Sequence, residues 1–133
     1  MPGYSGKPLW MKLGLKDGMR ATVINPPDGY HEELLSGAPD AQWTAPGPAQ
    51  DFTHIFATSR KALEATLTQT LAQMARDGMI WVSWPKKSAK VPTDVTEDTI
   101  RSVCLPMGLV DVKVCAVTDV WSGLKLVIRK ELR

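Results

Sequence analysis

The feature that most constrains the fold is a strand, helix and strand pattern within residues 52–84. Residues 52–57 are nearly all apolar, which is typical of a strand buried on both faces. Ser59 begins a helix in which apolar residues recur at helical spacing until Asp77-Gly78, and residues 79–84 form a second apolar strand. Because a helix that joins two strands in this way makes a right-handed parallel crossover, the pattern predicts an α/β fold.

Shorter elements precede this unit. We expect a short helix over residues 8–13, followed by a strand over residues 20–24 that is rich in β-branched side chains. Asp28 is expected to cap a second short helix, which Gly37 closes. A brief edge strand is expected at Trp43-Thr44, within a stretch rich in Pro, Gly and Ala. These strands extend the predicted sheet on its amino-terminal side.

The last third of the chain predicts a helix and a hairpin. Thr96 is a typical helix start, because its hydroxyl can cap the exposed amides and two acidic residues follow it. Residues 110–117 alternate as a strand does, with small and branched apolar side chains on one side. The link over residues 118–123 is too short for a parallel crossover, so residues 124–129 are expected to return antiparallel.

The composition is that of an ordinary globular protein. The chain has 133 residues, of which 44% are hydrophobic and 23% charged, so we expect one domain over residues 1–133. The net charge of +2 is too small to indicate nucleic-acid binding. No stretch approaches the roughly 18 apolar residues of a membrane span, and residues 1–6 carry no apolar signal region. These observations predict a cytoplasmic protein of bacterial type with no membrane partner.

The sequence offers few metal ligands. Its two cysteines, Cys104 and Cys115, fit neither a Cys-x-x-Cys redox pair nor a zinc spacing, and we expect both to be buried free thiols. The two histidines, His31 and His54, are far apart along the chain. We therefore expect no metal site.

The clearest candidate for a binding site is a cationic loop that follows the strand over residues 79–84. In α/β sheets, ligands gather where the carboxyl ends of the strands release their loops. A phosphate or carboxylate could bind there to three ammonium groups and a hydroxyl, those of Lys86, Lys87, Lys90 and Ser88. The alternative interpretation is a solvated loop without a ligand.

Other candidate residues lie on or near the predicted strands. Asn25 and Asp28 follow the strand over residues 20–24, where a cofactor would sit, although turn formation and helix capping also explain them. His54 is either a general base or a hydrogen-bonded core residue. Trp81 is expected in the core and Trp84 in a pocket or interface, with both indoles on the same sheet face.

The predicted order of elements is similar to the core of class I S-adenosylmethionine-dependent methyltransferases, in shortened form. This resemblance implies a single-domain Rossmann-like fold, with a mostly parallel sheet, helices on both faces and an antiparallel carboxyl-terminal hairpin. The chain also resembles a family of small bacterial proteins known as domain of unknown function 3052. That second resemblance is carried by three motifs, Tyr4-Ser5-Gly6-Lys7-Pro8-Leu9, Trp81-Val82-Ser83-Trp84-Pro85-Lys86-Lys87 and Trp121-Ser122-Gly123-Leu124-Lys125-Leu126.

The chain departs from the methyltransferase pattern at the loop that holds the cofactor. Those enzymes carry a glycine-rich loop after the first strand, whereas this chain has Asn25-Pro26-Pro27-Asp28-Gly29-Tyr30. The missing glycines would allow close backbone approach, and proline removes hydrogen-bond donors. No cofactor is therefore expected, and S-adenosylmethionine, the one that the resemblance implies, should not bind tightly.

Three functions are compatible with the sequence. The first is a non-catalytic binding or regulatory module on a degenerate methyltransferase-like scaffold, with a pocket for a small anionic ligand at the strand carboxyl ends. The second is a divergent methyltransferase or other transferase that uses Lys86, Lys87 or His54 on a small anionic substrate. The third is an interaction protein that forms a homodimer through the carboxyl-terminal hairpin.

The hairpin itself is rich in positive charge. Its basic residues either solvate the outer face of the sheet or form a stripe for an acidic partner. Apolar Val127 lies on the same alternation side, which keeps pairing of hairpin edges between two copies open. The basic residues are Lys113, Lys125, Arg129, Lys130 and Arg133.

Overall fold

A computed structural model describes residues 7–133 and contains one six-stranded sheet. The strands lie in the order β2-β1-β3-β4-β6-β5. The first four are parallel, β6 runs antiparallel to β4, and β5 runs antiparallel to β6. This arrangement confirms the predicted mostly parallel sheet with an antiparallel end. The strands are β1 (Arg20–Ile24), β2 (Gln42–Trp43), β3 (Phe52–Phe56), β4 (Met79–Pro85), β5 (Leu109–Ala116) and β6 (Trp121–Ile128).

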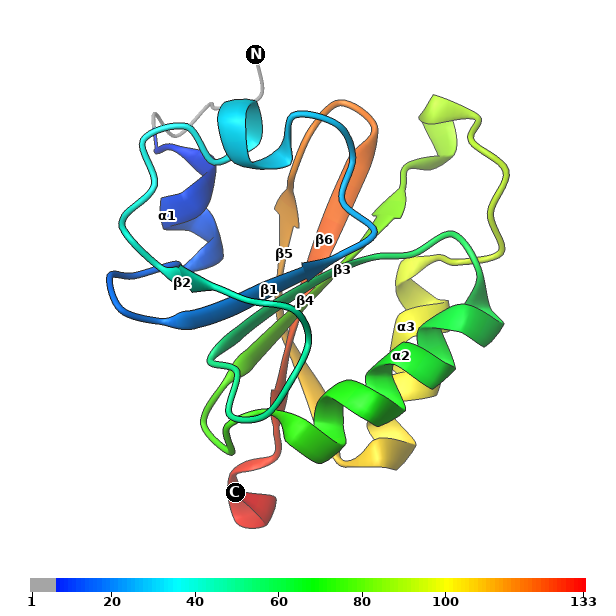
Figure 1. Cartoon of the computed structure of the whole chain (residues 1–133). Helices are drawn as coiled ribbons and strands as arrows, with labels where there is room; N and C mark the ends of the chain where they lie inside the picture. The colour runs from blue at the N-terminus through cyan, green and yellow to red at the C-terminus, as the bar shows by residue number, and fades with distance from the viewer. Residues whose placement is uncertain (1–6) are drawn as a thin grey trace.

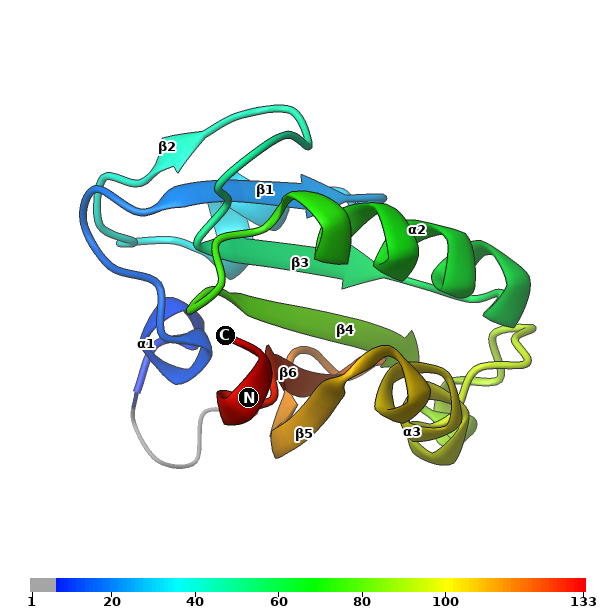
Figure 2. The ribbon, with the colours of Figure 1, turned by 90° about the horizontal axis from the view of Figure 1, so that it is seen from below.

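Helices cover both faces of the sheet. Helices α2 (Arg60–Gln73) and α3 (Glu97–Cys104) lie together on one face, and α1 (Leu9–Leu13) lies on the other (Figures 1 and 2). Both longer helices begin where the sequence predicts, because the hydroxyls of Ser59 and Thr96 accept hydrogen bonds from backbone amides of the first turn. Helix α2 joins the parallel strands β3 and β4, so the predicted crossover is confirmed.

The sheet separates two hydrophobic cores. The core under α2 and α3 is largely aliphatic, whereas the core under α1 contains the aromatic side chains of Tyr30, Phe52, Phe56 and Trp81. The fully buried indole of Trp81 donates a hydrogen bond to the backbone oxygen of Leu13 over 2.8 Å. This bond fixes the end of α1 against the middle of β4.

Two predictions near the site are wrong. Trp81 and Trp84 lie on opposite faces of the sheet, since they belong to different cores; residues three apart in a strand point in opposite directions. Asp28 does not cap a helix. The segment Tyr30–Leu34 is a single π-helical turn that begins after Gly29, at a φ of +79°, and no side chain caps it.

Element ends also differ from the sequence pattern. Helix α2 stops at Gln73 because Met74 is extended, and β6 begins at Trp121 rather than at residue 124. A register shift between Asp111 and Lys113 interrupts the alternation of β5. The apolar side predicted for this strand is consequently not covered, as the exposed fractions of 52% for Val112 and 51% for Val114 demonstrate. No helix within residues 7–133 is long and apolar enough to cross a membrane.

Candidate functional site

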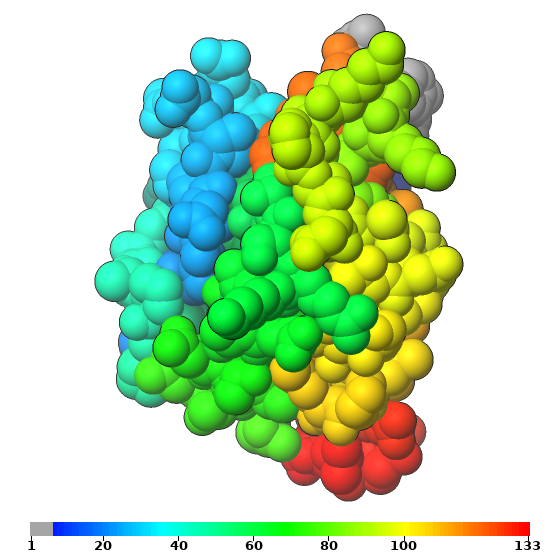
Figure 3. Space-filling model, turned by 90° about the vertical axis from the view of Figure 1, so that its right-hand side faces the viewer, coloured from blue at the N-terminus to red at the C-terminus, as the bar shows by residue number. Residues whose placement is uncertain are grey.

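The topology of the sheet directs attention to the carboxyl ends of β1 and β3. From β1 the chain moves outward to β2 on one side, whereas β3 lies on the other, so the strand order reverses between β1 and β3. Open α/β sheets bind ligands in the crevice at such a reversal. A cleft of about 210 Å³ lies there, lined by Asn25, Ile55, Phe56, Ala57, Thr58, Ser59, Ala62, Leu63, Thr66 and Trp121. Figure 3 looks onto this edge and displays a hollow between the blue segment that follows β1 and the lime segment that follows β4.

Local structure explains the shape of the cleft. Asn25 adopts a left-handed conformation with a φ of 57°, which asparagine tolerates better than most residues, so β1 ends abruptly at the rim. Trp121, at the start of β6, packs edge-on against Phe56, with ring centroids 5.1 Å apart. Hydroxyls from the start of α2 supply polar groups on the opposite wall. The lining contains no titratable side chain.

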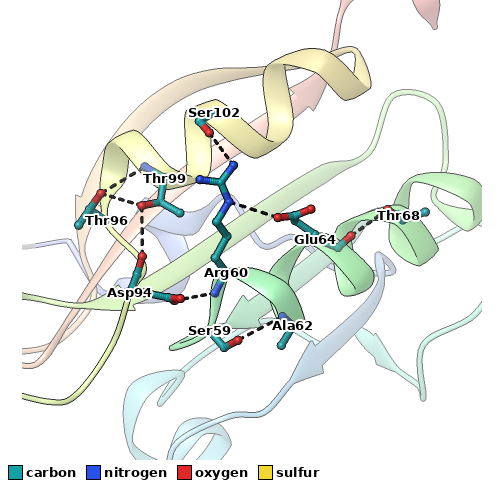
Figure 4. Close-up of polar contacts among 9 residues, drawn as sticks. All are labelled: Ser59, Arg60, Ala62, Glu64, Thr68, Asp94, Thr96, Thr99 and Ser102. Carbon is teal, nitrogen blue, oxygen red and sulfur yellow. Dashed lines mark hydrogen bonds and ion pairs between the residues drawn. The ribbon is translucent and has the colours of Figure 1, made fainter.

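The start of α2, beside the cleft, is capped by the protein's own groups. The amide of Arg60 donates to the Asp94 carboxylate over 2.7 Å, and the amide of Ala62 donates to the Ser59 hydroxyl over 3.3 Å (Figure 4). Free amides at a helix start attract anions. Here Asp94 already supplies the negative charge, which disfavours a second anion at this position.

The segment that carries Asp94 is held in place from both sides. The backbone oxygen of Asp94 accepts a hydrogen bond from the Thr99 hydroxyl of α3. The Arg60 guanidinium contacts Glu64 over 3.2 Å and Ser102 over 3.0 Å (Figure 4). These contacts join the beginning of α2 to α3. They position the Asp94 carboxylate under the first turn of α2.

His54 lies in the middle of β3 and is sealed from solvent. Its Nδ1 is 2.9 Å from the Tyr30 hydroxyl, and its Nε2 is 2.7 Å from the Ser83 hydroxyl. A neutral imidazole has one donor and one acceptor, so these two bonds satisfy the ring. Burial lowers the pKa of His54 to about 3 and raises the pKa of Tyr30 above its ordinary value. His54 is therefore a neutral core residue that does not face the cleft.

The cationic loop does not join the cleft. Residues Lys87–Ala89 form one 3₁₀ turn, and Lys90 follows in a left-handed conformation with a φ of 56°. Lys87, Ser88 and Lys90 are exposed, and their side chains are absent from the cleft lining, as is that of Lys86. The structure thus brings the predicted lysines together with one another, but not with Asn25 at the cleft.

Two further predicted residues lie outside the cleft. Asp28 is exposed on the loop after β1. Trp84 is only 9% exposed and packs in the aliphatic core under α2 and α3. Neither side chain belongs to the lining that contains Asn25.

Several lining residues were not anticipated from the sequence. Thr58, Ser59 and Thr66 gather at the cleft because β3 ends where α2 begins, and Trp121 reaches it from β6. The polar run after residues 52–57 was a usable signal, because parallel strands release their loops at the same edge. The approach of Trp121 depends on the pairing of distant strands, which no local pattern reveals.

The prediction for the thiols holds only in part. Both cysteines are free, and Cys104 is buried as predicted, but Cys115 is only partly buried. Burial raises the pKa of Cys104 to about 11, which keeps it protonated near neutral pH. Within residues 7–133, no group of three or more His, Cys, Asp and Glu side chains could hold a metal ion.

Comparison with known proteins identifies the sequence family and the fold. Residues 56–130 match the family described as protein of unknown function, DUF3052. No curated protein matches the sequence. The solved structures that resemble the chain include many methyltransferases, and identities near 10% mean that this likeness shows the fold alone.

Three of these structures illustrate the similarity. A SAM-dependent methyltransferase from Aquifex aeolicus gives a TM-score of 0.62 at 11% identity, over 90% of this chain and 88% of that one. Magnesium protoporphyrin IX methyltransferase from Synechocystis PCC 6803, with bound SAM, gives 0.58 at 10% identity, over 90% and 74%. A tRNA methyltransferase from B. subtilis gives 0.60 at 8% identity, over 92% and 65%. The chain therefore has a methyltransferase-like fold.

Proposed function

We propose that this chain is a non-catalytic binding or regulatory module of the bacterial cytoplasm. It belongs to the DUF3052 family, whose function is unknown, so its function is inferred from its own site. Its ligand would occupy the cleft at the carboxyl ends of β1 and β3. The scaffold is a methyltransferase-like sheet that serves binding instead of group transfer.

The observation that carries this proposal is the chemistry of the cleft lining. General acid–base catalysis requires a group that takes up and releases a proton close to the reacting atoms. The lining offers amide, hydroxyl, aliphatic and aromatic groups, and none of them titrates near neutral pH. The lining has three hydroxyls, those of Thr58, Ser59 and Thr66, but no side chain in it could act as a base toward any of them. Such a lining favours binding.

A transferase that relies on the other candidate groups has less support. His54 is fully buried between Tyr30 and Ser83, and a substrate would have to unfold the middle of the sheet to reach it. Lys86 and Lys87 lie on a loop outside the cleft lining. A catalytic role for these residues would require a site that the cleft does not provide.

The residues present do not fit S-adenosylmethionine, although structural neighbours have been solved with SAM bound. The cleft of about 210 Å³ is smaller than the pockets of about 300–1,000 Å³ that enclose drug-sized ligands. Two prolines without amide donors follow Asn25, and β2 has only two residues with no acidic side chain at its end. We propose that this protein uses no such cofactor.

The size of the cleft and its uncharged lining indicate what kind of ligand it would bind. The cleft volume of about 210 Å³ suits a small ligand such as a single planar ring system. Phe56 and Trp121 offer aromatic contact, and Asn25 offers an amide that can both donate and accept. Because Asp94 occupies the nearby helix start, these groups support an uncharged ligand over the anionic one that the loop lysines suggested.

The proposal can be tested by an NMR titration of the ¹⁵N-labelled protein with adenine and nicotinamide as probes. We expect shifts of the Asn25 side-chain amide, the Thr58 backbone amide and the Trp121 indole. Ala62→Phe should abolish these shifts because its ring fills the cleft, whereas Ala65→Phe, an exposed position of α2 outside the lining, should preserve them. Shifts that survive Ala62→Phe, or no response to any such probe, would contradict the proposed site.

A further inference from the structure

A second pocket lies at the opposite side of the sheet, between α1 and β5. Its volume is about 430 Å³, and its lining includes Met11 and Lys12 of α1 together with residues 113–116 of β5. Side chains of a strand alternate between the two faces of a sheet, so a pocket on one face touches every second residue. Four consecutive lining residues indicate that this pocket runs along the edge of the strand.

The edge of β5 is open to another strand within the part of the chain that the structure describes. β5 is the last strand in the sheet order and pairs only with β6 (Figure 2). Its outer amides and carbonyls therefore have no partner strand within residues 7–133. After the register shift at Asp111, residues 113–116 pair regularly with β6, which leaves their outer backbone groups in regular strand geometry.

The same edge carries unbalanced positive charge. Lys113 lies directly opposite Lys125 on β6, an arrangement of like charges that destabilises a sheet. Lys16 adds a third charge. Burial, together with the charges of Lys113 and Lys16, lowers the pKa of Lys125. Among residues 7–133, no carboxylate forms an ion pair with any of these three lysines.

The acidic side chain of the strand itself does not relieve this repulsion. Asp111 accepts a hydrogen bond over 3.0 Å from Arg101 of α3, on the other face of the sheet. Apolar side chains complete the edge, where Met11 is 46% exposed and Val114 is 51% exposed. The pocket thus combines an open strand edge, apolar contacts and a cluster of lysines.

We propose that residues 113–116 of β5 bind an extended acidic peptide segment of a partner protein by strand addition. The backbone of the peptide would pair with the outer edge of β5. On the α1 face its carboxylates would neutralise Lys113 and Lys125, and on the opposite face its apolar side chains would contact Val114. A second copy of this chain fits less well, since it would bring another set of lysines to the same edge. This site is independent of the cleft at β1 and β3.

The test measures binding of a fluorescein-labelled, end-capped (Glu-Val)₄ peptide by fluorescence anisotropy at low and moderate salt. We expect saturable binding that weakens with salt, and about tenfold weaker binding for Lys113→Glu, because the reversal replaces an attraction with a repulsion. Lys87→Glu makes the same change of net charge on an exposed lysine of the loop after β4, outside the pocket lining, and it should change the affinity less than about twofold. Lys113→Gln should fall between the two.

Hydrogen exchange then distinguishes strand addition from a purely ionic contact. Bound (Glu-Val)₄ should slow the exchange of backbone amides within residues 113–116 and leave the cleft titration with adenine unchanged. Equal losses for Lys113→Glu and Lys87→Glu, or no protection of these amides, would overturn the proposal. Equally effective competition by a single-stranded oligonucleotide of the same charge would overturn it too. A dimer in light scattering, with these amides protected before peptide is added, would identify a second copy as the occupant.

Discussion

The cleft at β1 and β3 and the pocket along β5 differ in whether their polar and charged groups have partners within the described chain. At the cleft, the first amides of α2 are satisfied by Ser59 and Asp94, and the lining is neutral. Along β5, Lys113 and Lys125 face each other without a carboxylate partner among residues 7–133. The comparison shows that Asp94 supplies the negative charge at the helix start beside the cleft, whereas Lys113 and Lys125 at the β5 edge have no such partner within residues 7–133.

The largest effect we expect concerns His54, which is buried in the middle of the sheet away from the cleft. The pKa of His54 is about 3 in the folded chain and about 6.5 in the unfolded chain. Between these values the unfolded chain binds a proton that the folded chain does not, so stability falls as pH falls from about 6.5 toward 3. The expected loss from this residue is about 1.4 kcal/mol per pH unit, and urea unfolding at several pH values measures it.

A matched variant separates His54 from the carboxylates that titrate in the same range. His54→Gln retains hydrogen-bonding capacity toward Tyr30 and Ser83 but does not take up a proton. The difference between the wild-type and variant profiles should shrink with falling pH below about 6.5 and remain constant above it. Parallel profiles throughout would contradict the assignment of His54 as a neutral core residue with a lowered pKa.

An intermediate effect is expected when the cap at the cleft is removed. Asp94→Ala deletes the acceptor of the Arg60 amide and should destabilise the protein by about 1 kcal/mol in urea unfolding. Asp94→Asn keeps an acceptor without the charge, so it should lose less. Sulfate should then stabilise Asp94→Ala more than the wild type, because the helix start becomes free for an anion. If sulfate acts equally on both proteins, Asp94 does not neutralise the cleft.

The smallest effect is expected at the β5 edge. Lys125→Gln removes one of two facing charges and should stabilise the protein by about 0.2–1 kcal/mol at low salt. The gain should diminish as salt screens the lysines. Lys130→Gln, at an exposed position after β6, is the matched control and should leave stability nearly unchanged. The measurement is the free energy of unfolding of each variant at low and at high salt. A loss of stability in Lys125→Gln would show that the repulsion between the lysines is absent.

Features set by local sequence could be predicted. The start of α2 at Ser59 and of α3 at Thr96 depends on a hydroxyl that reaches an amide three residues later. The crossover between β3 and β4 depends on the length of one helical segment. Such features need no knowledge of the rest of the chain.

Features set by distant contacts could not be predicted in the same way. Asp94 reaches the amide of Arg60 across 34 residues, and His54 finds Ser83 across 29. Nothing in the residues near Asp94 signals a partner at the start of α2. The fold was therefore largely predictable, whereas Asn25 was the only predicted residue that lines the cleft.

The register shift in β5 belongs to the same group. Alternation predicted one apolar side for this strand. The register shift after Asp111 places Val114 on the face of the aliphatic core, where its side chain is 51% exposed. Asp111 contacts Arg101 of α3 at the point where the register changes. A prediction from strict alternation cannot anticipate a single residue inserted into a strand.

The most direct test of the central claim is a calorimetric titration of the full chain with S-adenosylhomocysteine. We expect no measurable heat at millimolar ligand, because the cleft of about 210 Å³ and the Asn25-Pro26-Pro27 loop do not fit the cofactor. Micromolar binding that is lost in Ala62→Phe and kept in Ala65→Phe would contradict it, and would restore a methyltransferase activity to this scaffold.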